Sequence, residues 1–220
     1  MIIVFASSKG GVGKSTSCAA LGSYLASRGN RVHVMDLDQN QTLAVWSERG
    51  KVENLEVAAV PPEQFSEHFR TVAQNAFDHV FIDLAGVREI TLMKAIGKAD
   101  LVVIPAQHSE PDVRQALTIV SDIKDIEETL GREVPYRVLF TKVRPLKTRL
   151  DQFIEEELGR EQIARFDTVL VDRISYKEMF LNGVPPHRKE PERGAGLELA
   201  GLAREIDAIL GANSKLQAVG

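Results

Sequence analysis

A glycine-rich segment near the start of the chain combines residue types that bind phosphate. It reads Ser8-Lys9-Gly10-Gly11-Val12-Gly13-Lys14-Ser15-Thr16 and directly follows an apolar run. Glycines let the backbone turn so that several N–H groups point inward, and the positive end of a following helix faces the same space. Lys14 would add a positive charge, and the Ser15 hydroxyl would add a ligand for Mg²⁺. The segment therefore predicts a phosphate-binding loop.

Three aspartates lie at or after the ends of other apolar runs. Asp36 ends the run Val32 to Asp36, Asp38 comes two residues later, and Asp83 ends the run His79 to Asp83. Residues two apart on an extended chain lie on the same side, and parallel strands bind ligands at their carboxyl ends. We therefore expect these carboxylates to face a site for metal and phosphate. A pair of carboxylates in a solvated turn is the alternative for Asp36 and Asp38.

Apolar runs of strand length alternate with helical patterns along almost the whole chain. This alternation predicts an α/β fold with a central, mostly parallel twisted sheet that has helices on both faces. The expected strands are Ile2 to Ala6, Arg31 to Asp36, Leu55 to Val60, His79 to Asp83, Leu101 to Pro105, Arg137 to Thr141 and Thr168 to Val171. The expected helices are Lys14 to Arg28, Gln64 to Asn75, Ile90 to Gly97, Asp112 to Leu130, Leu146 to Leu158, Tyr176 to Asn182 and Leu197 to Leu210. Gly183 to Gly196 is expected to be a surface loop, and Trp46 is expected to pack in a short helix.

The composition is that of an ordinary globular protein. The 220 residues include 27 Lys and Arg against 31 Asp and Glu, with 44% hydrophobic and 26% charged residues. We expect one domain over residues 1–211 and a flexible tail over 212–220. The single cysteine, Cys18, excludes a disulfide within the chain and a cysteine-based zinc or iron–sulfur cage built by one chain alone. With no apolar stretch near ~18 residues and no signal peptide, we expect a cytoplasmic protein without a membrane partner.

The segment KGGVGKST, in which Lys9 precedes Lys14, resembles the deviant Walker A motif of the ParA/MinD family of P-loop ATPases. The resemblance extends to small ParA-type plasmid partition and positioning ATPases that lack an N-terminal helix-turn-helix. It implies a P-loop NTPase fold, ATP and Mg²⁺ as cofactors, hydrolysis of ATP to ADP and phosphate that is weak without a partner, and a homodimer when ATP is bound. In that family the early lysine reaches the phosphates of the partner subunit, so the resemblance assigns this role to Lys9. A solvated loop lysine is the alternative.

The same resemblance implies roles for further residues. Asp38 orients or activates the attacking water, which makes Lys9, Lys14 and Asp38 the catalytic set, while Ser15, Asp36 and Asp83 hold the metal. The residues implied to bind nucleotide are Lys9, Gly10, Gly11, Val12, Gly13, Lys14, Ser15, Thr16, Gly86 and Thr141. Gly86 would approach the γ-phosphate, and an ordinary glycine after a strand is the alternative. Thr141 begins the loop that packs on the adenine in the family.

Basic residues concentrate in the second half of the chain. The candidates for non-specific DNA binding are Lys142, Arg144, Lys147, Arg149, Arg173 and Lys177. Binding to the phosphate backbone needs clustered positive charge, and no element that would read bases is recognisable. The assignment of DNA binding to the ATP dimer comes from the resemblance, and a solvated basic face is the alternative.

The resemblance implies a positioning cycle. The ATP dimer would bind the nucleoid non-specifically, and a ParB-like or cargo-linked adaptor would stimulate hydrolysis and release, so that a plasmid, a chromosome or a protein cargo is moved. Three other functions stay open: a nucleotide-gated scaffold without DNA affinity, a conjugative-transfer ATPase, and a metabolic P-loop synthetase. The short end of the chain, with a single lysine after Ala212, disfavours a basic amphipathic membrane-targeting helix.

Overall fold

The computed structural model describes residues 1–84, 89–144, 146 and 149–217. Its centre is a six-stranded sheet in the order β3-β2-β4-β1-β5-β6, and every neighbouring pair is parallel. The strands are β1 (Ile2–Phe5), β2 (Val32–Asp36), β3 (Leu55–Ala59), β4 (His79–Asp83), β5 (Leu101–Ala106) and β6 (Tyr136–Phe140). Strands β2, β4 and β5 are buried along their whole length, as expected for apolar strands covered on both faces.

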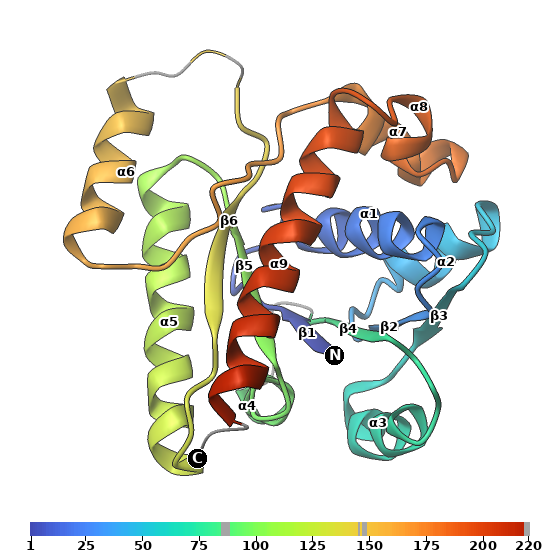
Figure 1. The fold of residues 1–220 in the computed structure, drawn as a ribbon, viewed down its shortest axis with the longest axis horizontal. Helices are drawn as coiled ribbons and strands as arrows, with labels where there is room; N and C mark the ends of the chain where they lie inside the picture. The colour runs from blue at the N-terminus through green and yellow to red at the C-terminus, as the bar shows by residue number, and fades with distance from the viewer. Residues whose placement is uncertain (85–88, 145, 147–148, 218–220) are drawn as a thin grey trace.

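Helices cover both faces of the sheet (Figure 1). One face carries α1 (Lys14–Ser27), α2 (Thr42–Arg49), α7 (Ile174–Asn182), α8 (Pro186–Lys189) and α9 (Ala195–Gln217). The other face carries α3 (Phe65–Ala73), α4 (Glu89–Ile96), α5 (Glu110–Leu130) and α6 (Arg149–Arg160). A short 3-10 helix, Pro62–Gln64, precedes α3. Successive side chains of the strands alternate between these two apolar layers, which confirms the predicted α/β fold.

The register of the parallel pairs brings three strand ends together. Phe5 of β1 lies beside Asp83 of β4, and Asp83 lies beside Asp36 of β2. The loop that follows β1 is the glycine-rich segment, so this segment and both aspartates meet at the carboxyl edge of the sheet. The sequence predicts the site at this edge of the sheet.

The seventh predicted strand, Thr168 to Val171, is wrong. The segment runs beside β6 and forms only an isolated bridge between Val143 and Val171. Two carboxylates of α9 accept backbone N–H groups of this segment: Glu205 from Thr168 at 2.8 Å and Glu198 from Val171 at 3.3 Å. Leu170 N–H donates to the Phe140 carbonyl at 2.8 Å and Val143 N–H to the Leu170 carbonyl at 3.1 Å, but the Thr168 N–H is taken by Glu205, so these backbone bonds do not continue as a regular ladder.

The end of the chain is more helical than the sequence predicted. The expected loop Gly183 to Gly196 contains α8, which begins at Pro186, a residue well suited to the first turn of a helix. Helix α9 continues to Gln217, past the expected end at Leu210 and into the expected tail. The expected short helix at Trp46 is α2, where Trp46 is buried. Within the described residues, no helix has the length and apolar character needed to cross a membrane.

A buried histidine on α8 predicts how stability depends on pH. The ring of His187 packs edge-on against Tyr24, with centroids 5.6 Å apart, and its two nitrogens have no hydrogen-bond partner among the described residues. Burial lowers the pKa of His187 to about 4, and the nearby charge of Arg188 contributes to the decrease. Because the folded-state pKa lies below the usual value of 6.5, the neutral ring stabilises the fold above pH 6.5, and this contribution is lost as the pH falls toward 4.

We therefore expect His187→Phe, which keeps a ring against Tyr24, to make the free energy of unfolding less sensitive to acid. Between pH 7 and pH 4.5 the variant should lose less stability than the wild-type protein, by on the order of 1–3 kcal/mol. Urea unfolding at both pH values measures the difference. An equal loss in both proteins would show that His187 does not carry this pH dependence.

Candidate functional site

The glycine-rich loop between β1 and α1 is held by residues from the ends of two other strands. After β6, the Thr141 hydroxyl donates to the Val12 carbonyl at 2.5 Å, and Lys142 Nζ donates to the Gly11 carbonyl at 2.6 Å. After β5, Gln107 Nε2 donates to the same Gly11 carbonyl at 3.3 Å. These contacts tie the glycine-rich loop to the ends of β5 and β6.

Gly13 is required by the backbone at the start of α1. Its φ of 92° lies in the left-handed region, where a side chain is strained, and a Cβ here would lie 3.3 Å from the Thr141 hydroxyl. Gly13 is also the N-cap residue of α1 and makes no side-chain cap. The N–H groups of the first turn are thus left to bind a ligand, as a phosphate site requires.

A buried ion pair lies beneath the loop. Lys14 Nζ is 3.6 Å from Asp83 Oδ1, and the side chains of both residues are almost completely buried. The carboxylate oxygens of Asp83 have no partner at full hydrogen-bond geometry among the described residues, although the Ser15 hydroxyl is close enough to lower the pKa of the carboxyl group. Burial raises the pKa of Asp83 to about 6, while the nearby Lys14 charge works against this rise. A buried carboxylate with unfilled acceptor capacity fits a cation bound in the same cavity.

Asp36 and Asp38 have different environments. Asp36 is buried, and its carboxylate accepts backbone N–H bonds from Leu43 at 2.8 Å, Ala44 at 3.2 Å and Asp38 at 3.1 Å. It therefore caps the N-terminus of α2 and ties the β2–α2 loop to the sheet. Burial also raises its pKa, against the effect of these hydrogen bonds. Asp38 is partly exposed and accepts from the backbone and side-chain amides of Asn40 at 2.8 and 3.0 Å.

The donor set fits Mg²⁺ held together with phosphate better than a metal held by protein alone. The described residues contain no group of three or more His, Cys, Asp or Glu side chains that would hold a metal ion. Mg²⁺ in phosphate sites typically takes one or two carboxylates and completes its shell with water and phosphate oxygens. Asp83, Asp36 and the partly buried Ser15 at the start of α1 can supply that smaller set.

Lys9 is paired within its own chain. Its ammonium group contacts the Asp112 carboxylate, which is buried in the first turn of α5. The other Asp112 oxygen accepts the Gln107 N–H at 3.2 Å, and the Ser109 side chain caps α5 by accepting the Asp112 N–H at 3.3 Å. The Lys9 side chain is 44% exposed, so it is accessible from solvent despite this pair.

A cavity of about 200 Å³ lies beside the first turn of α1. Thr16 and Ser17 line one side, and Thr141, Arg173 and Tyr176 line other parts. Glu198 of α9 organises this wall, since it accepts from Arg173 Nε at 2.6 Å and from the Tyr176 hydroxyl at 2.9 Å. The cavity adjoins the glycine-rich loop, where a group attached to a bound phosphate would lie.

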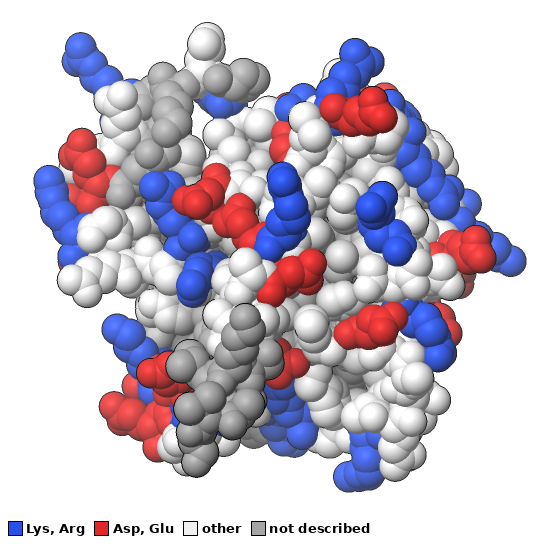
Figure 2. Space-filling model, in the orientation of Figure 1, with Lys and Arg blue, Asp and Glu red and all other residues white. Residues whose placement is uncertain are grey.

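The basic residues do not form one free cluster. Arg173 is paired with Glu198, Lys177 with Asp172 at 2.7 Å, and Lys142 with the Gly11 carbonyl. Arg144 and Arg149 are exposed. On the face shown in Figure 2, Lys and Arg side chains alternate with Asp and Glu side chains. Lys147 and Gly86 lie outside the described residues.

Sequence reasoning missed Gln107 and Glu198. Gln107 follows β5 at the same edge of the sheet as the other site residues, so the rule that ligands bind at the carboxyl ends of parallel strands was a usable signal. Glu198 had no such signal, because it lies on the polar side of a helix whose apolar face packs in the core. Its importance comes only from the tertiary contact.

The burial of Asp83 predicts a gain in stability when its charge is removed. Its folded-state pKa of about 6 lies above the usual 3.8, so the ionised form opposes folding at pH 7. We expect Asp83→Asn to raise the free energy of unfolding of the nucleotide-free protein by on the order of 1–3 kcal/mol at pH 7. Urea unfolding measures this change.

Asp36→Ala is the matched control on the neighbouring strand. It leaves three backbone N–H groups of the β2–α2 region without their acceptor, so we expect it to destabilise the same protein by roughly 1–3 kcal/mol. A loss of stability in Asp83→Asn similar to that of Asp36→Ala would contradict our account of Asp83.

The chain is similar to several known proteins. A protein named ParA from Rhizobium radiobacter is 32% identical over 197 residues, which cover 88% of each chain. Protein virC1 from Rhizobium rhizogenes is 28% identical over 148 residues, which cover 64% of each chain. The septum site-determining protein MinD of Pyrococcus horikoshii, solved with Mg-ADP, has the same fold. It superposes with a TM-score of 0.73 at 18% identity and covers 96% of this chain and 97% of its own.

A family model confirms the resemblance found in the sequence. The model described as "CobQ/CobB/MinD/ParA nucleotide binding domain" matches residues 3–185. This range contains the glycine-rich loop, both buried aspartates of the sheet edge, and the residues after β5 and β6 that hold the loop. The chain therefore belongs to the CobQ/CobB/MinD/ParA family of nucleotide-binding domains.

Proposed function

We propose that the chain is an ATPase of the partition and positioning type and that it binds ATP with Mg²⁺ at the glycine-rich loop. The observation that carries the proposal is the buried pair of Lys14 and Asp83, 3.6 Å apart, beneath a loop whose first helical N–H groups are uncapped. Two structural neighbours support the choice of ligand. One is the MinD complex with Mg-ADP, and the other is a putative plasmid partition protein of Borrelia burgdorferi bound to AMPPNP.

Different residues of the site would bind the phosphates, hold the metal ion and position the attacking water. Backbone N–H groups of Lys9 to Gly13 and of Ser15 and Thr16, with the ammonium of Lys14, would hold the phosphates. Ser15, Asp36 and Asp83 would hold Mg²⁺, which supplies positive charge at the phosphate oxygens when it is bound. Asp38, the more exposed carboxylate, would orient the attacking water.

Two further contacts belong to the proposal. Thr141 and the cavity beside it would receive the nucleoside, and Gly86 would contact the γ-phosphate. The cavity is a suitable place for the nucleoside because it opens beside Thr16 and Ser17 on the first turn of α1.

A homodimer that forms on ATP binding is the second part of the proposal. Lys9 would then act on the phosphates of the partner subunit, as a positive residue supplied in trans. In the isolated chain its ammonium contacts Asp112, so the dimer would have to exchange this contact for a phosphate. Lys9 would then leave Asp112 only when both a nucleotide and the partner subunit are present.

The third part is a cycle on DNA. The ATP dimer would bind the nucleoid non-specifically through basic side chains, and a ParB-like or cargo-linked adaptor would stimulate hydrolysis and release a cytoplasmic monomer. Arg144 and Arg149 are the described candidates with the greatest freedom to contact DNA, because Lys142, Arg173 and Lys177 are engaged within the chain. Lys147 remains a candidate on sequence alone.

Binding to a non-specific DNA duplex tests this proposal. We expect Asp38→Ala, which should retain ATP without turning it over, to bind DNA with ATP and Mg²⁺ and not with ADP or without nucleotide. Raising the salt from about 50 to 200 mM should weaken binding by at least tenfold, because counterions are released from phosphates. Fluorescence anisotropy of a labelled duplex measures both effects.

Lys14→Ala is the control that should bind neither nucleotide nor DNA. DNA binding that is equal with ATP, with ADP and without nucleotide would contradict the proposal that ATP controls DNA binding. An ATP-dependent dimer without DNA affinity would favour a nucleotide-gated scaffold instead.

A further inference from the structure

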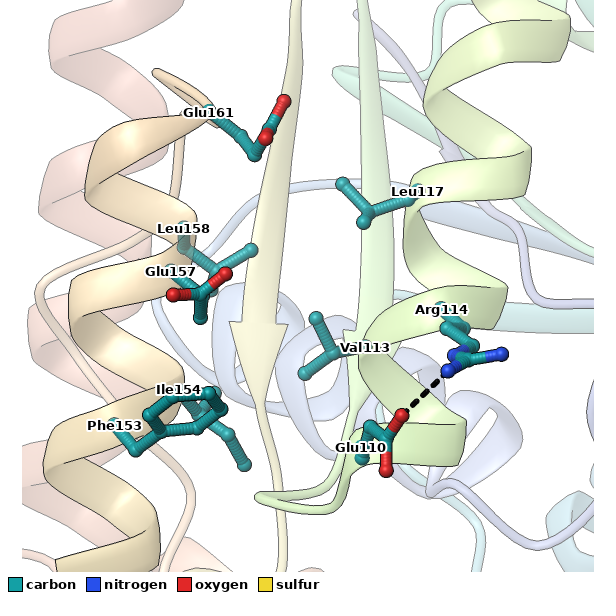
Figure 3. Close-up of a pocket in the computed structure, with 9 residues that line it drawn as sticks. All are labelled: Glu110, Val113, Arg114, Leu117, Phe153, Ile154, Glu157, Leu158 and Glu161. Carbon is teal, nitrogen blue, oxygen red and sulfur yellow. Dashed lines mark hydrogen bonds and ion pairs between the residues drawn. The ribbon is translucent and has the colours of Figure 1, made fainter.

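Helices α5 and α6 enclose an apolar groove with a volume of about 460 Å³ (Figure 3). Val113 and Leu117 of α5 face the groove from one side, and Phe153, Ile154 and Leu158 of α6 line the other side. Phe153 is 53% exposed although it is a large aromatic residue. An exposed aromatic on the wall of an apolar groove is typical of a binding surface.

Acidic side chains border this groove. Its lining includes three glutamates, Glu110, Glu157 and Glu161, and a single arginine, Arg114. Glu110 is paired with Arg114 at 2.6 Å, and Glu157 is paired with Arg160. Glu161 is exposed and makes no ion pair with any other side chain that the structure describes. The border thus has an excess of negative charge and is complementary to a positively charged occupant.

The length of the groove fits a short helix. One wall runs from Glu110 to Leu117 on α5, and the other runs from Phe153 on α6 to Glu161, the residue after the end of α6. At ~1.5 Å per residue, each wall is about 12 Å long, or roughly two helical turns. Two turns of an amphipathic helix present apolar side chains at positions i, i+4 and i+7, which is the pattern recognised by grooves of this kind.

We propose that the groove between α5 and α6 binds a basic amphipathic helix of the partner protein that stimulates ATP hydrolysis. This inference rests on the proposed function, since it identifies where the adaptor docks and which chemistry recognises it. Leucine-like side chains of the helix enter between Phe153 and Leu117, and its lysines or arginines meet Glu161 and the neighbouring glutamates.

The position of the groove connects it to the glycine-rich loop. The two turns of α5 that contain Val113 and Leu117 also contact the glycine-rich loop. They do so through side chains on another side of the helix. Asp112 pairs with Lys9, and Gln115 accepts the Ser8 hydroxyl. A helix bound in the groove therefore packs against the same two turns of α5 that hold Lys9, and a shift of these turns would act directly on that pair.

A designed peptide tests the groove in the full chain. The probe is a fluorescein-labelled peptide of about 18 residues with leucines at i, i+4 and i+7 spacing and lysines on the other face. A second peptide has glutamate in place of each lysine. Anisotropy measures the affinity of both peptides, and phosphate release measures turnover with ATP and Mg²⁺. We expect the lysine peptide to bind and to raise turnover, and the glutamate peptide to do neither.

Two variants locate the binding, and two others are matched controls. Phe153→Ser and Glu161→Lys should each lower the affinity for the lysine peptide by about tenfold and leave ATP turnover without peptide unchanged. Both positions are exposed, so neither change removes a core contact. Leu181→Ser replaces an apolar residue that is 77% exposed on α7, and Glu128→Lys changes an exposed acid near the far end of α5; neither should affect binding.

Binding that is absent, that is equal for both peptides, or that is unchanged in Phe153→Ser and Glu161→Lys would overturn the proposed groove. Groove-dependent binding without stimulation, in a protein that does hydrolyse ATP, would overturn the choice of partner. Groove-dependent binding to a protein without any turnover would support the docking site and contradict the proposed function, so the two failures are distinguishable.

Discussion

The site depends on the parallel register of β1, β2 and β4. This register sets Asp83 beside Phe5 on one side and beside Asp36 on the other, so that the glycine-rich loop begins where both carboxylates end their strands. A shift of one residue in either pair would turn an aspartate to the opposite face of the sheet. The apolar side chains of these strands, which pack into two separate helical layers, hold the register in place.

The two buried aspartates at this edge of the sheet differ in what their carboxylates do. One stabilises the fold, and the other is available to a ligand. The Asp36 carboxylate is satisfied by three backbone N–H groups and holds the β2–α2 loop, whereas the Asp83 carboxylate accepts no backbone N–H of the described residues and has the Lys14 charge and the Ser15 hydroxyl nearby. Burying a carboxylate that accepts no backbone N–H costs free energy, and a bound cation offsets that cost. Of the two buried aspartates at this edge, Asp83 is therefore the one whose environment favours a bound cation.

The parts of the fold that follow local rules could be predicted from the sequence. Six strands and the phosphate-binding loop follow from apolar runs, glycines and the position of aspartates at strand ends. The interactions that could not be predicted join residues far apart in the chain. Asp112 meets Lys9 across 103 positions, and Glu205 and Glu198 accept the backbone N–H groups of Thr168 and Val171 from 37 and 27 positions away. Such contacts depend on how helices dock, which periodicity does not specify.

The most direct test of the account is a calorimetric titration of the wild-type protein with ATP at pH 7, with Mg²⁺ and with EDTA. If Lys14, Ser15 and Asp83 form one site for phosphate and cation, ATP should bind with one site per chain in Mg²⁺. Its affinity should fall at least about tenfold in EDTA, since the bound cation offsets the charge between Asp83 and the phosphates. ATP binding that is equally tight without Mg²⁺, or no binding in either condition, would contradict the account.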